Sequence, residues 1–549
     1  MDDSSVVSSP ASSPVAKANL KPSDPLVALV LFLVPLMLLA MALPPNRSNG
    51  GVIKQYWALG AAIAIAGIAG AVWWRTRSTL PLILMGTAIL LMAQITWGIS
   101  FRAYGAAHKD YTREVFRRAM RLSLHAPVYG RYDNAFFREN PETGRYEFNT
   151  LPFVFLSGLI AAAWYGWSLR RSWDRPWCKR ALATLMGFQL AMIVAFAACE
   201  PWPSRFSLNI SGYSEFKKDL PAFKGVRQTL RTYVAKMPRL EWYGQHYPPG
   251  NLIALKIENE LHLPGMTKAL VCLCTVLAIL PLWRLTRELE FDNAATSATL
   301  LLFAAGTGVL IYCTLNTTSL LLLPGTMCLW MLIRALKTGE MIAAGALGAC
   351  FVFYTFFSFS ASILGVLMAL TTLIGWWAGA FTLRNLIRTG AISLATVACL
   401  VAALYATTHF NLVACFIAAV RGHQAQQGNE GFDDAKRWML RSTGNLIAYG
   451  FSIIPLCILG VAAVKSAKPQ AAKALFVALF VSVVVASFSG LFYIETERIW
   501  VFLTPAFALA AGWELSRRAK REGADLLTTV FLLVLIISCT QEWLFMHYR

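Results

Sequence analysis

The chain has 549 residues, of which 57% are hydrophobic and only 14% are charged, and its mean hydropathy is positive. Soluble globular proteins carry about 25% charged residues, so this composition excludes a soluble protein, and the many apolar residues exclude a disordered one. A formal net charge of +20 would favour a nucleic-acid partner in a soluble protein. In a chain this apolar it favours membrane and anionic lipid instead, with no nucleic acid. The composition indicates a polytopic membrane protein.

The first 26 residues are rich in Ser and Pro and predict a disordered cytoplasmic tail over 1–26. The segment Ala40-Met41-Ala42 resembles a signal-peptide cleavage site. Because a long polar region precedes it and membrane spans follow it, we favour an uncleaved first helix.

Apolar runs that approach the length of a membrane span recur along the whole chain. A spanning helix needs about 20 apolar residues, and about fifteen runs qualify. They lie near 27–43, 57–74, 79–98, 151–169, 181–199, 266–283, 294–313, 319–335, 341–357, 361–378, 389–408, 445–464, 474–492, 498–513 and 525–542. We predict an all-α polytopic membrane protein with about 13–15 transmembrane helices, connected by outer loops that are themselves helical.

Basic residues gather in alternate short connections between these runs. The clusters are Arg75 and Arg77, 170–180, Arg284 and Arg287, Arg334 and Lys337, Arg384 and Arg388, 465–473, and 517–521. Cytoplasmic loops carry an excess of Lys and Arg, and with fifteen spans every cluster falls on the same side. The topology therefore predicts a cytoplasmic N-terminus and an outer C-terminus.

Three long hydrophilic stretches then fall on the outer face, namely 100–150, 201–265 and 409–444, together with a short turn at 493–498. The first contains a basic amphipathic segment, 108–125, which predicts an interfacial helix that either binds a lipid phosphate or anchors the chain. The third contains Asp433-Asp434 and has the composition of a lid over an acceptor. Without further acids at defined spacing, this pair does not indicate a metal site, and we expect no metal and no cofactor.

The stretch 201–265 has the most informative pattern. Glu200 ends the preceding apolar run, Tyr213, Glu215 and Asp219 follow, and a helix is expected from about Lys224 to Lys236. The stretch closes on His246-Tyr247-Pro248-Pro249-Gly250, directly before an apolar helical run. Pro-Pro-Gly predicts a rigid extended turn, which would hold the His and Tyr side chains at a fixed depth.

This layout resembles the GT-C superfamily of integral-membrane glycosyltransferases, which includes the protein mannosyltransferases and the lipid A aminoarabinose transferases. The resemblance rests on the acidic loop, the His246–Gly250 turn, and the late turn Glu495-Thr496-Glu497-Arg498 before Ile499-Trp500. It covers about 181–513. Many family members carry Asp-Glu or a lone Asp near the start of the loop, whereas here Glu200 is followed by no acid until Glu215. Which carboxylate is the base is therefore open.

The resemblance implies an inverting hexosyl- or pentosyltransferase that moves a sugar from a polyprenyl-phosphate donor to an acceptor hydroxyl on the extracytoplasmic face. The acceptor is a glycan, a lipid or a protein, and membrane lipids are further partners. The chemistry needs a carboxylate to take the acceptor proton and cationic groups to stabilise the departing phosphate. For the base, Glu215 is the first choice, Asp219 the second and Glu200 the third.

For the donor phosphate, Arg498 is the leading residue, because the planar guanidinium suits phosphate oxygens. An ion pair with Glu495 or Glu497 is the alternative role for this arginine. His246 either donates to the same phosphate or caps the helix that follows. Supporting roles fall to residues of the same loops: Tyr213, Tyr247 (an interfacial anchor), Glu495, Glu497 and Arg441.

These patterns divide the chain into four parts. They are the tail 1–26, an N-terminal membrane module 27–180 with outer loop 100–150, a GT-C-like core 181–513 with outer loops 201–265 and 409–444, and a last helix with its tail, 514–549. The membrane would be the plasma or inner membrane in a bacterium and the endoplasmic reticulum in a eukaryote.

Two other classes of protein fit the composition, a secondary transporter and a non-catalytic scaffold in envelope or glycan assembly. Transporters place charged residues near the bilayer midplane and often contain paired broken helices. The apolar runs here contain almost no ionisable residues, and the polar residues gather in the outer loops. This distribution favours the enzyme.

Overall fold

The computed structural model describes residues 78, 80–86, 137–139, 146–148, 158, 173, 175–198, 216–312, 317–427, 435–489 and 499–544. The tail 1–26, the first two predicted spans, and most of the third and fourth lie outside these residues. The division into an N-terminal module and a core stays a prediction.

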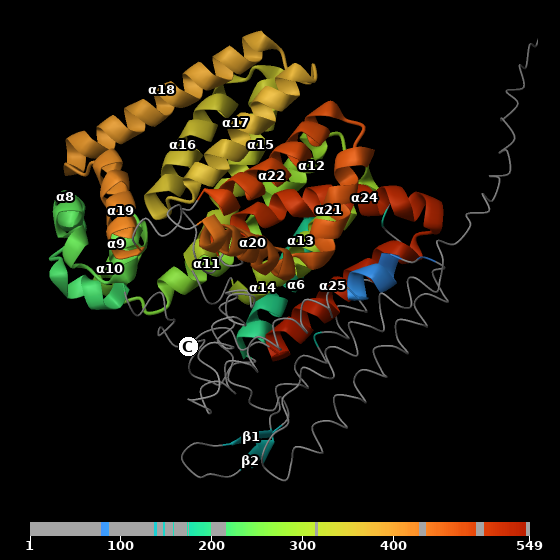
Figure 1. Cartoon of the computed structure of the whole chain (residues 1–549), viewed down its shortest axis with the longest axis horizontal. Coiled ribbons are helices and arrows are strands. Elements are labelled where there is room, and N and C mark those ends of the chain that lie inside the picture. The colour runs from blue at the N-terminus through green and yellow to red at the C-terminus, as the bar shows by residue number, and fades with distance from the viewer. Residues whose placement is uncertain are drawn as a thin grey trace, which may run out of the picture.

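Helices make up nearly all of the described chain (Figure 1). In chain order they are α6 (Lys179–Ala198), η1 (Leu220–Ala222), α8 (Val226–Lys236), η2 (Met237–Arg239), α9 (Trp242–His246), α10 (Gly250–Glu260), α11 (Met266–Leu277), α12 (Ile279–Glu288), α13 (Asn293–Ala305), α14 (Thr307–Tyr312), η3 (Thr317–Leu321), α15 (Leu322–Thr338), α16 (Met341–Phe357), α17 (Ala361–Trp377), α18 (Leu383–Thr408), α19 (Leu412–Gln427), α20 (Ala435–Ser452), α21 (Ile454–Ser466), α22 (Gln470–Phe488), η4 (Val501–Leu503), α24 (Thr504–Glu522) and α25 (Asp525–Leu544). The all-α class predicted from the sequence is confirmed.

One short hairpin departs from the expectation of purely helical outer loops. Strands β1 (Phe137–Glu139) and β2 (Tyr146–Phe148) pair antiparallel, with Phe137 opposite Phe148. The six residues between them in the sequence, 140–145, include Asn, Pro and Gly, which are strong turn formers.

Five described segments are long and apolar enough to cross a membrane: Lys179–Phe196, Met266–Glu288, Thr317–Thr338, Leu383–Thr408 and Gln470–Phe488. Six further described helices are apolar but shorter: Asn293–Ala305, Met341–Phe357, Ala361–Trp377, Leu412–Gly422, Ile454–Ser466 and Asp525–Ser538. The protein is a multi-pass membrane protein.

Helices α13 and α24 pack closely at the centre of the bundle (Figure 1). Their contact depends on Gly512, because a Cβ at that position would lie 2.2 Å from Oγ1 of Thr299 and 2.6 Å from its backbone nitrogen. Small residues at helix interfaces are the usual means of close packing between membrane helices, where apolar lipid tails weaken the hydrophobic drive for association.

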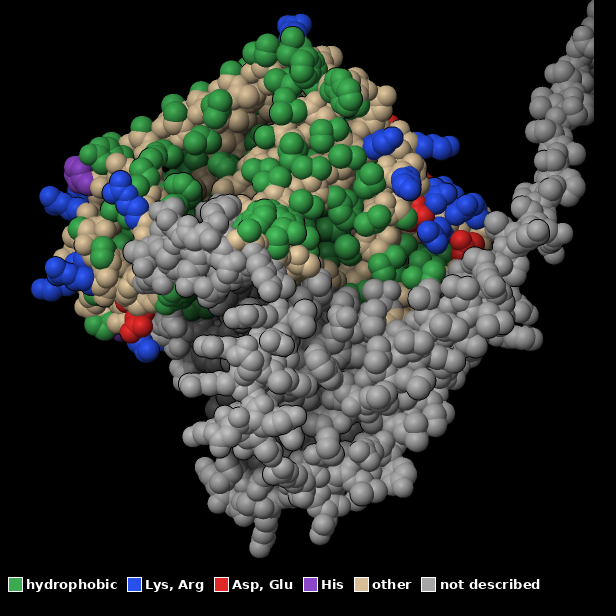
Figure 2. Space-filling view, viewed as in Figure 1, with side chains coloured by type: hydrophobic (Ala, Val, Ile, Leu, Met, Phe, Trp, Pro, Cys, Tyr) green, Lys and Arg blue, Asp and Glu red, His purple; other side chains and the backbone are tan. Residues whose placement is uncertain are grey.

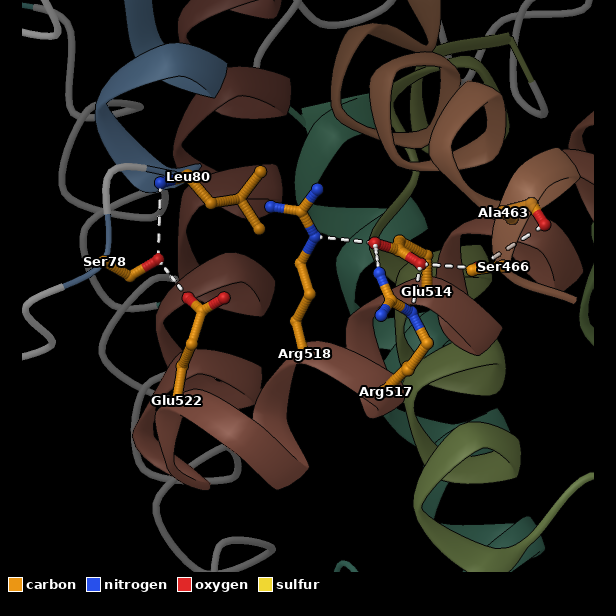
Figure 3. A network of polar contacts seen from close by, with 8 residues as sticks. All are labelled: Ser78, Leu80, Ala463, Ser466, Glu514, Arg517, Arg518 and Glu522. Atoms are coloured by element: carbon orange, nitrogen blue, oxygen red, sulfur yellow. Dashed lines mark hydrogen bonds and ion pairs between the residues drawn. The ribbon is translucent and has the colours of Figure 1, made fainter. Parts of the chain in front are cut away.

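A buried ionic network holds one end of the bundle together (Figure 3). The fully buried carboxylate of Glu514 accepts hydrogen bonds from Ser466 Oγ (2.6 Å), from Arg517 Nε and Nη2 (2.8 and 2.7 Å) and from Arg518 Nε (2.7 Å). The network joins the end of α21 to the C-terminal half of α24.

Other basic connections meet at this same end, which we call the basic end. The contacts that join them are Arg334 with Glu288 and Glu340, Lys337 with Glu290, Lys520 with Asp292, Asn385 Nδ2 with the Leu336 carbonyl, Ser78 with Glu522, and Trp177 Nε1 with Ser297. The structure thus gathers at one end the loops that the positive-inside rule assigns to the cytoplasm. Which compartment this end faces stays a prediction.

At the opposite end, two stretches that are far apart in sequence fold into one small unit (Figure 1, left). Its separate apolar core is formed by Phe216, Leu220, Phe223, Leu230, Tyr233, Met237, Leu240, Leu252, Ile253, Leu255, Phe410, Leu412, Cys415 and Ala419. We call η1, α8, η2, α9, α10 and α19 together the cap unit. Helices α16 and α18 run from the basic end to this unit, so the predicted outer stretches 201–265 and 409–444 meet in space.

Figure 2 shows a broad apolar surface between these two ends, with Lys and Arg side chains at its two edges. One basic edge lies over the cap unit and the other around the end of α24. This arrangement is typical of a protein whose apolar band lies in a bilayer.

Candidate functional site

The short helix α9 lies at the centre of the cap unit and is held at its start by Asp219. Oδ1 of Asp219 accepts the backbone N–H of Glu241, the N-cap residue of α9, at 2.9 Å. Asp219 is 5% exposed, and its Oδ2 has no hydrogen-bond partner among the described residues. Burial raises the pKa of Asp219, and the N–H of Glu241 only partly offsets this effect. The buried carboxyl group of Asp219 therefore holds the start of α9.

Gly244 leaves the room that this carboxyl group needs. A Cβ at Gly244 would lie 2.4 Å from Oδ2 of Asp219 and 2.8 Å from Cβ of Leu240. A larger residue at this position would displace either α9 or the carboxyl group.

A second anchor for the turn comes from α8. The hydroxyl of Tyr233, which is fully buried, lies 3.0 Å from the carbonyl oxygen of Gly244 and 2.9 Å from that of Tyr247, and donates to this pair. Burial raises the pKa of Tyr233, so the hydroxyl keeps its proton and remains a donor. The apolar spacing of α8 predicts a buried Tyr233 but cannot reveal which carbonyls it contacts.

The Pro-Pro-Gly segment places α10 directly on the membrane bundle. Pro248 and Pro249 are buried, and a Cβ at Gly250 would lie 2.4 Å from the carbonyl oxygen of Phe356. Nδ2 of Asn251 donates to the carbonyl of Phe357 at 3.3 Å. The end of α16 thus seats the turn, and the glycine provides the close approach of the two backbones.

His246 ends α9 with its ring against Trp242. The two ring centroids are 4.2 Å apart, and Nδ1 lies 2.6 Å from the carbonyl oxygen of Trp242. Because a carbonyl only accepts, Nδ1 carries the hydrogen, and the neutral ring then has its lone pair at Nε2. Burial lowers the pKa of His246, which favours this neutral form. Donation from Nε2 to a phosphate would require the doubly protonated ring.

Tyr247 belongs to an aromatic cluster at the same turn. Its ring centroid lies 5.6 Å from that of Tyr243 and 6.4 Å from that of Phe216, which directly follows Glu215 in the chain. Residues Phe216 to Asp219 form a helical turn. The structure therefore brings Asp219, His246 and Tyr247 together around α9.

Glu258 in α10, which the sequence interpretation did not single out, connects the cap unit to the start of α11. It is buried and accepts the backbone N–H groups of Gly265 (3.0 Å) and Thr267 (2.9 Å), at the start of α11. Burial would raise the pKa of Glu258, but the hydrogen bonds from Thr267 and Gly265 and the nearby Lys217 outweigh it, so the pKa is lowered. Glu258 acts as an ionised cap of α11.

The other predicted site residues lie outside the described residues: Glu200, Tyr213, Glu215, Glu495, Glu497 and Arg498. Arg441 lies in α20, and its side chain is likewise outside the described part of the chain, as is Asp433-Asp434. Within the described ranges, no group of three His, Cys, Asp or Glu side chains is placed to hold a metal ion. The absence of a metal from the reaction stays a prediction.

No protein-family model matches this sequence, and no curated protein matches it. Among solved structures, the chain is similar to oligosaccharyltransferases of Archaeoglobus fulgidus. The complex with Zn and sulfate is 15% identical with a TM-score of 0.42, and the match covers 65% of this chain and 53% of that chain.

The archaeal oligosaccharyltransferase AglB, in complex with an inhibitory peptide and a dolichol-phosphate, is 15% identical with a TM-score of 0.45, covering 67% of this chain and 56% of that chain. The apo form is 14% identical with a TM-score of 0.41, covering 66% and 56%. The chain spans little more than half the length of these archaeal proteins. At this level of similarity, the activity has to be argued from the residues of this chain.

Proposed function

We propose that this protein is an integral-membrane glycosyltransferase that moves a sugar from a polyprenyl-phosphate donor to an acceptor hydroxyl at the cap end. The observation that carries the proposal is the braced turn at α9. Asp219, Tyr233 and Gly250 hold the His246–Gly250 segment rigidly on the end of the membrane bundle. A lipid-linked donor requires such a fixed polar site at the edge of an apolar bundle, because its tail stays in the bilayer while its phosphate reacts at the surface.

Within this proposal, Glu215 is the base that takes the acceptor proton, and Asp219 is a positioning residue. A base must reach the acceptor hydroxyl, whereas the Asp219 carboxyl group is buried and one of its oxygens holds Glu241. Glu215 directly precedes the helical turn that ends in Asp219, so the same anchor would orient it.

Arg498 is the proposed contact to the donor phosphate, and the cap end is the proposed extracytoplasmic face. Arg498 directly precedes Ile499 and Trp500, and Trp500 is fully buried in the bundle. In the proposal, the guanidinium lies close to the bilayer surface, where the phosphate of a lipid donor lies. A fixed, planar guanidinium suits both the ground state and the departing phosphate.

The test is donor binding by the purified full-length protein in detergent, with a panel of radiolabelled polyprenyl-phosphate sugars. We expect saturable, tail-dependent binding of one donor, weakened about tenfold or more in Arg498→Ala. The matched control is Arg388→Ala, an exposed arginine at the basic end, which should bind as the wild type does. If folded protein binds none of the donors, the proposed function is wrong, and a transporter or scaffold becomes the better interpretation.

A further inference from the structure

In the cap unit, basic side chains outnumber acidic ones, and half of the acidic ones are buried. Residues 216–265 contain eight Lys and Arg side chains and four Asp and Glu side chains. Two of the four acids, Asp219 and Glu258, are buried and accept backbone N–H groups. The surface of the cap unit is therefore more positive than the count of charges indicates.

Four of the eight cations already interact inside the unit, with an acidic side chain or a backbone carbonyl: Lys217, Lys218, Lys236 and Lys256. The other four are exposed and make no side-chain hydrogen bond or ion pair with any described residue: Lys224, Arg227, Arg231 and Arg239. We call these four residues the α8 cation group.

Two members of the group, Arg227 and Arg231, lie within α8, and the electrostatics of the helix disfavour cations there. The positive end of the helix dipole lies at the N-terminus, where α8 has no acidic residue and Arg227 occupies the first turn. Arg227 and Arg231 are four residues apart, a spacing at which like charges repel on a helix. Cations that weaken their own helix and have no partner inside the protein indicate a binding partner outside it.

The opposite face of α8 is already covered. Thr229, Leu230 and Tyr233 are buried in the cap unit, and the residues of α8 that are exposed are Arg227, Gln228, Arg231 and Ala235. A helix that binds a membrane surface normally inserts an apolar face into the headgroup region, and α8 has none to spare. A water-soluble polyanion is the better partner.

We propose that the α8 cation group binds the acceptor, and that this acceptor is a glycan chain bearing carboxylate or phosphate groups. The proposal rests on the proposed glycosyltransferase function. Helix α8 contacts the site turn directly through Tyr233, so a chain bound along α8 lies next to the turn where transfer occurs.

The experiment uses full-length protein in nanodiscs of phosphatidylcholine, which carry no net charge. Binding of a fluorescent oligogalacturonate, an oligosaccharide of uronic acids, is compared with that of a neutral dextran oligosaccharide of equal length. We expect selective, salt-sensitive binding of the anionic glycan, about tenfold weaker in the double variant Arg227→Gln/Arg231→Gln.

The matched control is Arg384→Gln/Arg388→Gln, which removes two exposed arginines at the same four-residue spacing from α18 at the basic end. It should bind as the wild type does. Equal weakening in both double variants, or equal binding of the anionic and neutral glycans, would overturn the proposal.

A second arm uses nanodiscs that contain phosphatidylglycerol. If Arg227→Gln/Arg231→Gln changes the association with this anionic lipid and leaves oligogalacturonate binding unchanged, the group is a membrane contact and the proposal is wrong. This assay contains no sugar donor, so it measures glycan binding separately from donor binding. If the protein binds the anionic glycan here but binds no donor in the panel of polyprenyl-phosphate sugars, only the proposed function is wrong.

Discussion

At the scale of single residues, the candidate site depends on the carboxyl group of Asp219, and the proposed base, Glu215, lies four positions before it in the sequence. Asp219 is buried and holds the backbone of Glu241. A general base must reach the acceptor hydroxyl, and this carboxyl group is buried with one oxygen held by a backbone N–H. The proposed roles, Glu215 as base and Asp219 as anchor, rest on this burial of Asp219.

Replacing each carboxylate with its amide separates these roles. Glu215→Gln should lower the rate of sugar transfer by about 100-fold or more, because the general base is lost. The melting temperature should not change, because the substitution removes no structural anchor. Asp219→Asn should keep most of the activity, since its amide oxygen still accepts the N–H of Glu241. Rates in detergent and the melting temperature are the measurements. An inactive but equally stable Asp219→Asn, together with an active Glu215→Gln, would exchange the two roles.

His246 predicts a pH dependence of donor binding. Because Nδ1 donates to the Trp242 carbonyl, only the imidazolium can donate to a phosphate from Nε2. Burial lowers the pKa of His246, so this contact should form only as the pH falls below the usual titration range of histidine. The donor KM, measured from about pH 8 to about pH 5, should fall at the acid end. A His246→Ala variant with the same acid-side fall in KM would rule out this role.

Sequence reasoning located the turn at 246–250 but not the contacts that hold it. The Pro-Pro-Gly pattern indicates a rigid bend from local chemistry alone. The seat of Gly250 on Phe356 joins residues more than 100 positions apart, and nothing in either local sequence specifies that pairing. For Tyr233, the spacing of apolar residues on α8 indicates that the side chain is buried. The spacing does not indicate which carbonyl oxygens the hydroxyl contacts.

At the scale of elements, two of the expected spans agree closely with observed helices. The predicted run 341–357 is α16, and 361–378 is α17 with one residue fewer. Three other runs are interrupted: 266–283 at Ala278, three residues before Pro281, 294–313 at Gly306, and 445–464 at Ile453, next to Ile454-Pro455. Glycine and proline inside apolar runs weaken helices without changing hydropathy, so run length alone misses these breaks.

The close contact between the start of α10 and the end of α16 gives a prediction at the scale of elements. Gly250→Ala should push α10 off the bundle, because the added Cβ meets a backbone oxygen that cannot rotate away. We expect a lower melting temperature, with a loss of about 1–3 kcal/mol in the free energy of unfolding, and a larger loss of transfer activity. The matched control is Gly390→Ala in α18, where a Cβ meets nothing within 4 Å. Equal stability and activity of the two variants would show that α10 is not seated in this way.

At the scale of the whole molecule, the two ends of the bundle have different structures. At the basic end, ion pairs join short connections, and the buried Glu514 links α24 to the end of α21 (Figure 3). The cap end is built from two long stretches with their own apolar core. The distribution of Lys and Arg in the sequence predicts that each set of loops shares one face. It could not show that the stretches around α9 and α19 pack together, because that contact is not local.

Glu514 should be a main determinant of stability at the basic end. Glu514→Gln removes the charge that Arg517 and Arg518 neutralise inside the protein, and should lower the free energy of unfolding by about 3 kcal/mol. The control is Glu290→Gln, which breaks the ion pair of an exposed glutamate with Lys337 and should change stability by less than about 1 kcal/mol. Thermal unfolding in detergent compares the two, and a Glu514 variant as stable as the control would contradict the account.

The central claim is that the cap end of this membrane protein catalyses sugar transfer from a lipid-linked donor. The most direct measurement is the release of labelled sugar from the panel of polyprenyl-phosphate sugars by full-length protein in proteoliposomes, with a membrane-envelope extract as the source of acceptors. The account predicts that the wild type turns over one donor and that Glu215→Gln, folded and inserted equally well, does not. Release of no sugar from any donor by folded wild-type protein, or equal release by both proteins, would contradict it.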